Sequence, residues 1–149
     1  MTFHINWLAV FVASISSFII GAVWFGPKTF YPVWMKALGR EIPKVRVSMT
    51  GGETFLMFGG TYVAGLVQVV TLAFVISLGR TADANFGAAT GALFGFLFSL
   101  GLGAFASLSH RMFGQADFKV YRSIKVWLIE VGQDVVAVTI AGLILGAWL

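Results

Sequence analysis

Four long apolar stretches dominate this chain, and each is long enough to cross a lipid bilayer. They cover residues 5–25, 55–78, 86–108 and 126–149. An α-helix rises 1.5 Å per residue, so about 20 apolar residues span the roughly 30 Å hydrocarbon core. Only helices and closed barrels satisfy the backbone in lipid, and this sequence lacks the alternating pattern of barrel strands. The sequence therefore predicts an all-α integral membrane protein with four transmembrane helices.

Composition places all 149 residues in one membrane domain. Hydrophobic residues make up 58% of the chain and charged residues 11%, whereas about a quarter of a soluble domain is charged. The longest polar stretch, Lys28 to Glu53, is too short to build a core of its own. The first apolar stretch has no basic residue before it and reaches spanning length, so we expect it to remain in the mature protein rather than to be cleaved as a signal peptide.

The basic residues predict the orientation. Nine of the ten lie in the first and third loops: Lys28, Lys36, Arg40, Lys44, Arg46, Arg111, Lys119, Arg122 and Lys125. The positive-inside rule assigns both loops to the cytoplasm and both termini to the extracytoplasmic side. We therefore expect a multi-pass protein of the inner (plasma) membrane. Contact with the lipid bilayer accounts for the basic excess, and no nucleic-acid partner is predicted.

A short interfacial segment is predicted after the first span. Between Thr29 and Leu38, aromatic residues mix with cations, which suits a short helix or turn at the headgroup level. The expected interfacial anchors are Trp24, Tyr31, Trp34 and Lys36. Contact with a partner is the alternative to simple anchoring, and anchoring is favoured because aromatic belts are common at both membrane interfaces.

Rows of small residues predict which helices pack closely. The third span carries such residues at every fourth position: Gly87, Gly91, Gly95, Ser99, Gly103 and Ser107. The first span carries a shorter row: Ala9, Ala13, Ser17 and Gly21. Small residues at this spacing let helix backbones approach in lipid. We expect the first and third spans to be the tightly packed pair, either within one chain or between copies.

The fourth span contains the candidate site. Glu130 and Asp134 are the only acidic residues within any predicted span, and their spacing of four places them on one face. Gln133 lies beside them, and Gln68 and Tyr62 of the second span are expected at similar depth. One hypothesis is a proton- or cation-binding site, since ionisable groups inside a membrane are usually functional. The other is a structural network in which Arg111, Arg122 or Lys125 reaches Glu130.

Other chemistry is not indicated. His4 and His110 belong to opposite membrane faces by the predicted topology, and no cysteine is present, so neither a metal site nor a thiol nucleophile is expected. Ser14, Ser16 and Ser17 have no base nearby in the sequence, and hydroxyls in membrane helices usually bond to their own helix. The sequence predicts no enzymatic activity and no cofactor.

The chain resembles a bacterial family known as domain of unknown function 1761. The resemblance rests on Asn6-Trp7-Leu8-Ala9-Val10, on Gly21 to Pro27, on Trp34-Met35-Lys36 and on Gly142 to Trp148. It implies a small four-helix membrane protein of no established activity. The family tends to read Ile-Asn-Ala-Gly-Tyr where this chain has Ile129-Glu130-Val131-Gly132-Gln133. This departure implies that a site built on Glu130 and Asp134 need not be a family function.

Two functions from different classes follow. The first is a membrane protein that acts through helix contacts, as a homo-oligomer or as an accessory subunit of a larger membrane complex. The alternative is a small proton- or cation-coupled transporter or channel that uses Glu130 and Asp134. The small-residue rows favour the first function, and the acids in the fourth span favour the second.

Overall fold

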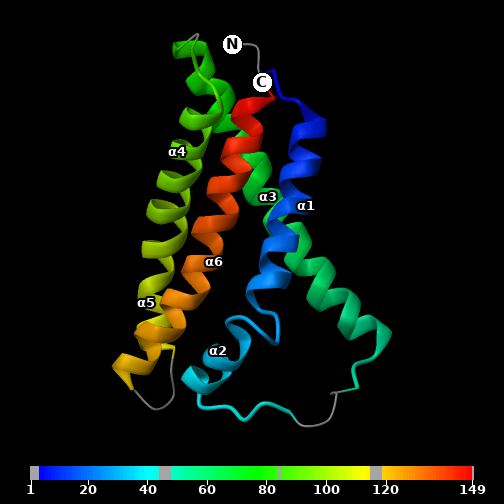
Figure 1. Ribbon diagram of the computed structural model, residues 1–149, viewed down its shortest axis with the longest axis vertical. Helices are drawn as coiled ribbons and strands as arrows, with labels where there is room; N and C mark the ends of the chain where they lie inside the picture. Colours follow the sequence, from blue (N-terminus) through cyan, green and yellow to red (C-terminus); the bar gives the residue numbers. More distant parts are fainter. Residues whose placement is uncertain (1–3, 44–47, 84, 115–118, 149) are drawn as a thin grey trace.

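The computed structural model describes residues 4–43, 48–83, 85–114 and 119–148, and these are helical with no strand among them (Figure 1). The elements are α1 (Trp7–Trp24), α2 (Tyr31–Leu38), α3 (Gly51–Ala82), α4 (Ala88–Phe98), the π-helix η1 (Ser99–Ala104), α5 (Phe105–Phe113) and α6 (Val120–Ala147). α4, η1 and α5 form one continuous helix, Ala88–Phe113. With α1, α3 and α6 it makes four helices that are long and apolar enough to cross a membrane. The predicted all-helical structure with four long apolar helices is therefore confirmed for the described residues.

Capping residues set where the first two long helices begin. The Asn6 side-chain oxygen accepts hydrogen bonds from the backbone N–H groups of Leu8 and Ala9, at 3.1 and 3.2 Å. Thr50 and Glu53 form a capping box: the Glu53 carboxylate accepts from the Thr50 N–H, and the Thr50 hydroxyl accepts from the Glu53 N–H. This box starts α3 four residues before the predicted span, because polar capping residues precede the apolar stretch.

The short helix α2 lies where the sequence predicts an interfacial helix or turn. Pro32 sits in its first turn, where the missing N–H costs no hydrogen bond. It ends at Gly39, whose φ of 73° is left-handed and favours glycine. Met35 and Ala37 are buried, and the Arg122 guanidinium at the start of α6 donates to the Ala37 carbonyl at 3.3 Å. α2 is therefore joined to α6 by side-chain contacts.

α6 is the central helix. It contacts α1, α2, α3, α4, η1 and α5, and it runs between α4 and α1 in Figure 1. The core contains Ala13, Leu72 and Ala141, which are fully buried. α6 also begins at Val120, earlier than the predicted residue 126, because Ser123 and Val126 are buried and continue its packed face.

Within one chain, the first and third spans do not form the tightly packed pair. The glycine row of α4 packs on α6 instead, where Gly142 and Gly146 supply the matching small face. A Cβ on Gly91 would overlap the Gly142 carbonyl oxygen, and a Cβ on Gly146 would lie 2.6 Å from the Gly87 carbonyl oxygen. α1 packs on another side of α6 and on α3.

The small residues of the two predicted rows do not all lie at contacts between helices. Gly87, Gly91, Gly95 and the buried Ser99 lie at the crossing with α6, whereas a Cβ on Gly103 would meet nothing within 4 Å. The Ser107 hydroxyl donates to the Ala104 carbonyl of its own helix at 2.8 Å. In α1, Ala9 and Ala13 are buried in the core, the Ser17 hydroxyl reaches the Ala137 carbonyl at 3.4 Å, and Gly21 adjoins the Gln133 amide. In the third span, the predicted row of small residues therefore packs against another helix only from Gly87 to Ser99.

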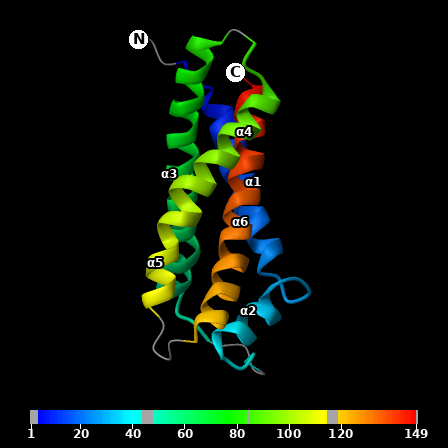
Figure 2. The same cartoon turned by 90° about the vertical axis from the view of Figure 1, so that its left-hand side faces the viewer.

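The two ends of the molecule differ in charge. The start of α1, the end of α6 and the junction between α3 and α4 lie at one end, and α2, the end of α5 and the start of α6 lie at the other (Figures 1 and 2). The Asn6 amide donates to the Trp148 carbonyl at 3.0 Å, which joins the first and last helices. The described basic residues of the first and third loops gather at the α2 end, and Arg80 lies at the other. Lys44 and Arg46 lie outside the described residues.

Candidate functional site

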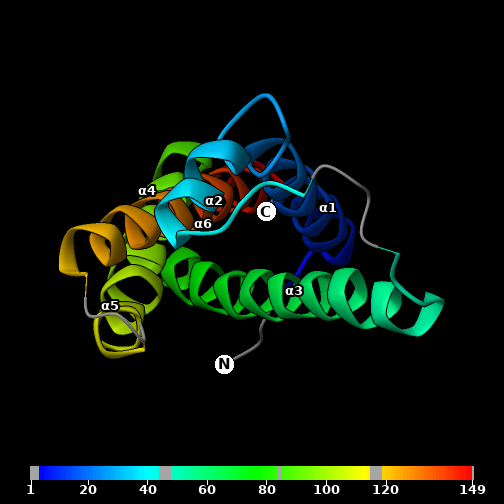
Figure 3. The same cartoon turned by 90° about the horizontal axis from the view of Figure 1, so that it is seen from below.

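A cavity of about 740 Å³ lies between α1, α3 and α6, and α2 borders it at one end. It forms because α3 diverges from α1 in its first half (Figure 1), so that the buried residues of α3 begin only at Val69. Seen from the α2 end, α3 runs along one side of the molecule, and α1, α2 and α6 lie on the other (Figure 3). The side chains on these facing helices therefore line a common space.

All five residues of the predicted proton or cation site line this cavity: Tyr62, Gln68, Glu130, Gln133 and Asp134. The sequence places the two acids on one face of α6, and the structure turns that face toward α1 and α3. Gln68 and Asp134 lie close to the midpoints of α3 and α6. The polar groups therefore meet near the middle of the apolar helices, at the depth where a bilayer solvates charge least.

Asp134 has no partner within the described part of the chain. Its carboxylate makes no ion pair and no hydrogen bond to any described residue, and no basic side chain is among the described residues that line the cavity. Gln133, its neighbour in sequence, packs beside Gly21 of α1. The Asp134 carboxylate is thus available to a proton or to a bound molecule.

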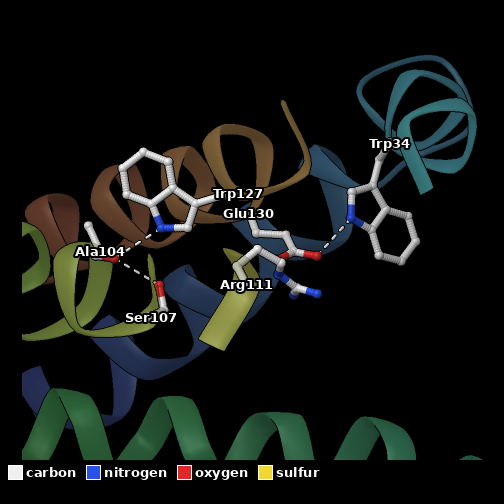
Figure 4. Close-up of polar contacts among 6 residues, drawn as sticks. All are labelled: Trp34, Ala104, Ser107, Arg111, Trp127 and Glu130. Atoms are coloured by element: carbon white, nitrogen blue, oxygen red, sulfur yellow. Dashed lines mark hydrogen bonds and ion pairs between the residues drawn. The ribbon is translucent and has the colours of Figure 1, made fainter. Parts of the chain in front are cut away.

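Glu130 has the opposite environment (Figure 4). Its carboxylate pairs with the Arg111 guanidinium of α5 and accepts a hydrogen bond from the Trp34 indole N–H of α2 at 2.9 Å. Among the three cations that the sequence offers as partners for Glu130, Arg111 makes the contact, whereas Arg122 binds carbonyl groups of α2 and Lys125 is exposed. The structural hypothesis therefore describes Glu130 well, although the residue still borders the cavity.

Aromatic rings form much of the remaining wall. The Phe18 and Tyr62 rings meet edge to face, with centroids 5.8 Å apart, and the Phe25 and Trp34 rings do so at 5.3 Å. Phe58 of α3 also lines the cavity. Sequence reasoning missed Phe18, Phe25 and Phe58, because phenylalanine in a membrane span is ordinarily interpreted as lipid-facing.

The serines of α1 behave partly as predicted. The Ser14 and Ser17 hydroxyls donate to the Phe11 and Ala13 carbonyls of their own helix, at 2.8 and 3.0 Å. Ser14 also shares a hydrogen bond with the Tyr62 hydroxyl across the cavity, at 3.2 Å. The signal for this contact was available in the sequence, since Ser14 and Tyr62 are both polar residues within apolar spans.

Two predicted interfacial anchors also connect helices. The Trp24 indole N–H donates to the Ile129 carbonyl at 2.9 Å, and its ring lies against Gly132. The Trp34 indole N–H donates to the Glu130 carboxylate. Of the other two predicted anchors, Lys36 is exposed and Tyr31 borders the cavity. The two indoles therefore join α1 and α2 to α6, a role that was not predicted.

The histidines lie away from the cavity. His4 borders a separate hollow of about 580 Å³ at the end opposite α2, together with Asn6, Ser77 and Arg80. His110 is exposed near the end of α5. Across the described ranges, no group of three or more His, Cys, Asp or Glu side chains is placed to hold a metal ion.

The comparison with protein families adds one finding. A family model described as "Protein of unknown function (DUF1761)" matches residues 8–146, nearly the whole chain. The chain belongs to the DUF1761 family. The resemblance inferred from the sequence is therefore confirmed. No curated protein and no solved structure matches the chain.

The residues on which the DUF1761 resemblance was recognised hold the helices together. Asn6 caps α1 and bonds to the Trp148 carbonyl, Trp24 bonds to α6, and Gly142 and Gly146 allow α4 to approach. Trp34 joins α2 to α6 through Glu130 and also borders the cavity. These DUF1761 motifs thus account for the helix arrangement, and the acids of the cavity lie outside them.

Proposed function

We propose that this DUF1761 protein binds a proton or a cation within the membrane and acts as a small transporter or channel. The observation that carries the proposal is the Asp134 carboxylate, which lines a cavity at the middle of α6 without a partner in the described chain. The rival function, action through helix contacts, loses much of its support because the α4 glycine row is used inside the chain.

The energetics of burial favour a functional acid. A charged carboxylate at the centre of a membrane helix costs about 2.5 to 3.5 kcal/mol on insertion scales. Arg111 and Trp34 offset that cost for Glu130, but the described chain supplies no such group to Asp134. Protonation or a bound cation removes the uncompensated charge. Asp134 is therefore the residue to which we assign binding.

The basic residues support an orientation for this activity. The described basic residues of the first and third loops gather at the end that carries α2, which the positive-inside rule places in the cytoplasm, and Arg80 lies at the opposite end. We place the protein in the inner membrane with α2 on the cytoplasmic side. The cavity then runs from the bilayer centre toward the cytoplasmic interface.

Proton or cation flux in liposomes tests the proposal. The full chain is reconstituted, an ion gradient is applied, and internal pH and membrane potential are followed with dyes. Asp134→Asn is expected to reduce flux at least tenfold, because the amide keeps the shape but carries neither charge nor an exchangeable acid proton.

Glu53→Gln is the matched control. It is the same acid-to-amide change at an exposed capping position outside the cavity, and glutamine also serves in a capping box. Flux is expected to be unchanged in this variant. Absence of flux in the parent protein, or equal flux in the parent and Asp134→Asn, would contradict the proposal.

A second proposal concerns assembly. A Cβ on Gly60 of α3 would meet nothing within 4 Å, and Gly60 is exposed and outside the cavity lining, so the described chain leaves the helix backbone uncovered there. We propose that the homo-oligomer expected from the small residues forms there, since close backbone approach drives association in lipid. Light scattering in mild detergent should report a smaller particle for Gly60→Leu than for the parent protein. Identical masses would contradict it.

A further inference from the structure

We infer that the cavity accepts a bulky organic cation, one that carries its positive charge on a largely apolar body. This inference rests on the proposed function and names its ligand class. It depends on three properties of the described cavity: its charge, its aromatic wall and its size.

The charge of the cavity selects a cation. Asp134 and Glu130 both line it, but the Arg111 guanidinium pairs with Glu130. No basic side chain is among its described lining residues. When ionised, Asp134 therefore leaves one uncompensated negative charge, which attracts cations and repels anions of the same shape.

The aromatic wall favours an organic cation over a metal ion. Rings contributed by α1, α2 and α3 line the cavity, among them Phe18, Phe25, Trp34, Phe58 and Tyr62. Ring faces attract quaternary ammonium and related cations, and they bury the apolar groups around the charge. A small inorganic cation needs several oxygen ligands in place of its water shell. In the described cavity, Asp134 is the only acid without a basic partner, and apart from those of Glu130 the other side-chain oxygens belong to neutral groups that give a small cation no further charge.

The size of the cavity agrees with this class. Its volume of about 740 Å³ falls within the roughly 300 to 1,000 Å³ of sites for organic ligands. Such sites are mostly apolar, with a few polar groups that set the orientation of the ligand. Gln68, Gln133 and the hydroxyl pair of Ser14 and Tyr62 supply those polar groups.

Equilibrium dialysis with radiolabelled tetraphenylphosphonium tests the inference. The full chain is held in mild detergent, and sodium is used as a competitor. Binding of radiolabelled tetraphenylborate, an anion of matched shape, is measured in separate samples. We expect saturable binding of the cation to the parent chain, no competition by sodium, little binding of tetraphenylborate, and cation binding at least tenfold weaker in Asp134→Asn.

A second variant tests the aromatic wall of the cavity without disturbing the fold. Phe58 is 51% exposed, so Phe58→Leu removes a ring from the wall without opening the core. Binding is expected to weaken about threefold, the size of a partly solvated cation–π contact. Glu53→Gln should bind like the parent chain.

The outcomes distinguish the inference from the function on which it rests. Equal binding of tetraphenylborate, non-saturable uptake, or unchanged binding in Asp134→Asn would overturn the organic-cation inference. If these occur while proton or sodium flux still depends on Asp134, the proposed function stands without this ligand class. Saturable, Asp134-dependent binding without any flux would support the ligand class and overturn transport.

Discussion

Glu130 and Asp134 share one face of α6 but have different neighbours. Both line the same cavity. Glu130 is within reach of Arg111 from α5 and Trp34 from α2, whereas Asp134, one turn deeper, is beyond both. Glu130 is therefore part of a contact among three helices, whereas the Asp134 carboxylate stays available to a ligand or a proton.

The Arg111–Glu130 pair should be energetically coupled. The side chains are 37% and 22% exposed, so the pair is partly solvated and its contribution is modest. A double-mutant cycle of Arg111→Gln and Glu130→Gln, followed by thermal unfolding in detergent, should give a coupling of about 0.5 to 1 kcal/mol. The glutamine at position 130 still accepts from the Trp34 indole, which isolates the ionic part.

Arg80→Gln provides the control for this cycle. Arg80 is an exposed arginine at the other end of the molecule, so it should show no coupling to Glu130→Gln. Strictly additive effects of Arg111→Gln and Glu130→Gln would show that the contact does not contribute to stability.

At the level of elements, the crossing of α4 and α6 depends on glycine. The carbonyl oxygens of Gly91 and Gly142 each occupy the space that a Cβ on the other residue would need. These obstructing atoms belong to the backbone, which cannot rotate away as a side chain can. The whole helix would have to move to admit a methyl group.

Gly91→Ala should destabilise the protein by about 1 to 3 kcal/mol, the usual cost of overpacking. Thermal unfolding monitored by circular dichroism in detergent measures the change. Gly52→Ala is the matched control, because a Cβ there meets nothing within 4 Å, and it should be neutral or stabilising. Equal stability of the two variants would show that α4 does not approach α6 this closely.

The π-helix η1 is the second feature at this scale. Its i→i+5 pattern appears in the bond from the Phe105 N–H to the Leu100 carbonyl. The Ala104 carbonyl accepts from the Trp127 indole of α6 at 3.0 Å and from the Ser107 hydroxyl (Figure 4). The irregular turn therefore presents a carbonyl to α6, which joins the two helices beyond the glycine crossing.

Trp127→Phe should remove this indole bond while retaining an aromatic ring. We expect a loss of about 1 kcal/mol, the typical contribution of one hydrogen bond, in the same unfolding assay. Trp7→Phe is the control, since Trp7 is 62% exposed at the start of α1. A Trp127→Phe variant as stable as the control would show that the indole hydrogen bond to Ala104 does not contribute to stability.

At the level of the whole molecule, the absence of cysteine makes the orientation easy to test. Glu41→Cys and Asn85→Cys place single exposed thiols at opposite ends of the structure. In intact cells, a membrane-impermeant maleimide should label Asn85→Cys, and it should label Glu41→Cys only after permeabilisation. The reverse pattern would place α2 outside the cytoplasm.

Much of the fold was predictable because bilayer solvation acts locally along a chain. Largely apolar stretches near 20 residues predict spans regardless of what surrounds them. The helix ends were less accurate, since capping by Thr50 and the continued packing of α6 from Val120 depend on particular contacts. The pairing of helices within the chain could not be read from the small-residue rows, because the row of the third span meets α6 and not α1. A row of small residues fits any helix with a matching small face, and the face of Gly142 and Gly146 is only two residues long.

The sequence by itself determined four apolar helices, the position of two acids on one face and the accumulation of basic residues in two loops. The tertiary structure decided that α6 lies at the centre, that Arg111 and Trp34 reach Glu130, and that Asp134 lines a cavity without a partner in the described chain. Hydropathy and helical periodicity act between residues close in the chain. The environment of a buried carboxylate is set by groups brought from distant helices, and only the packed molecule places them.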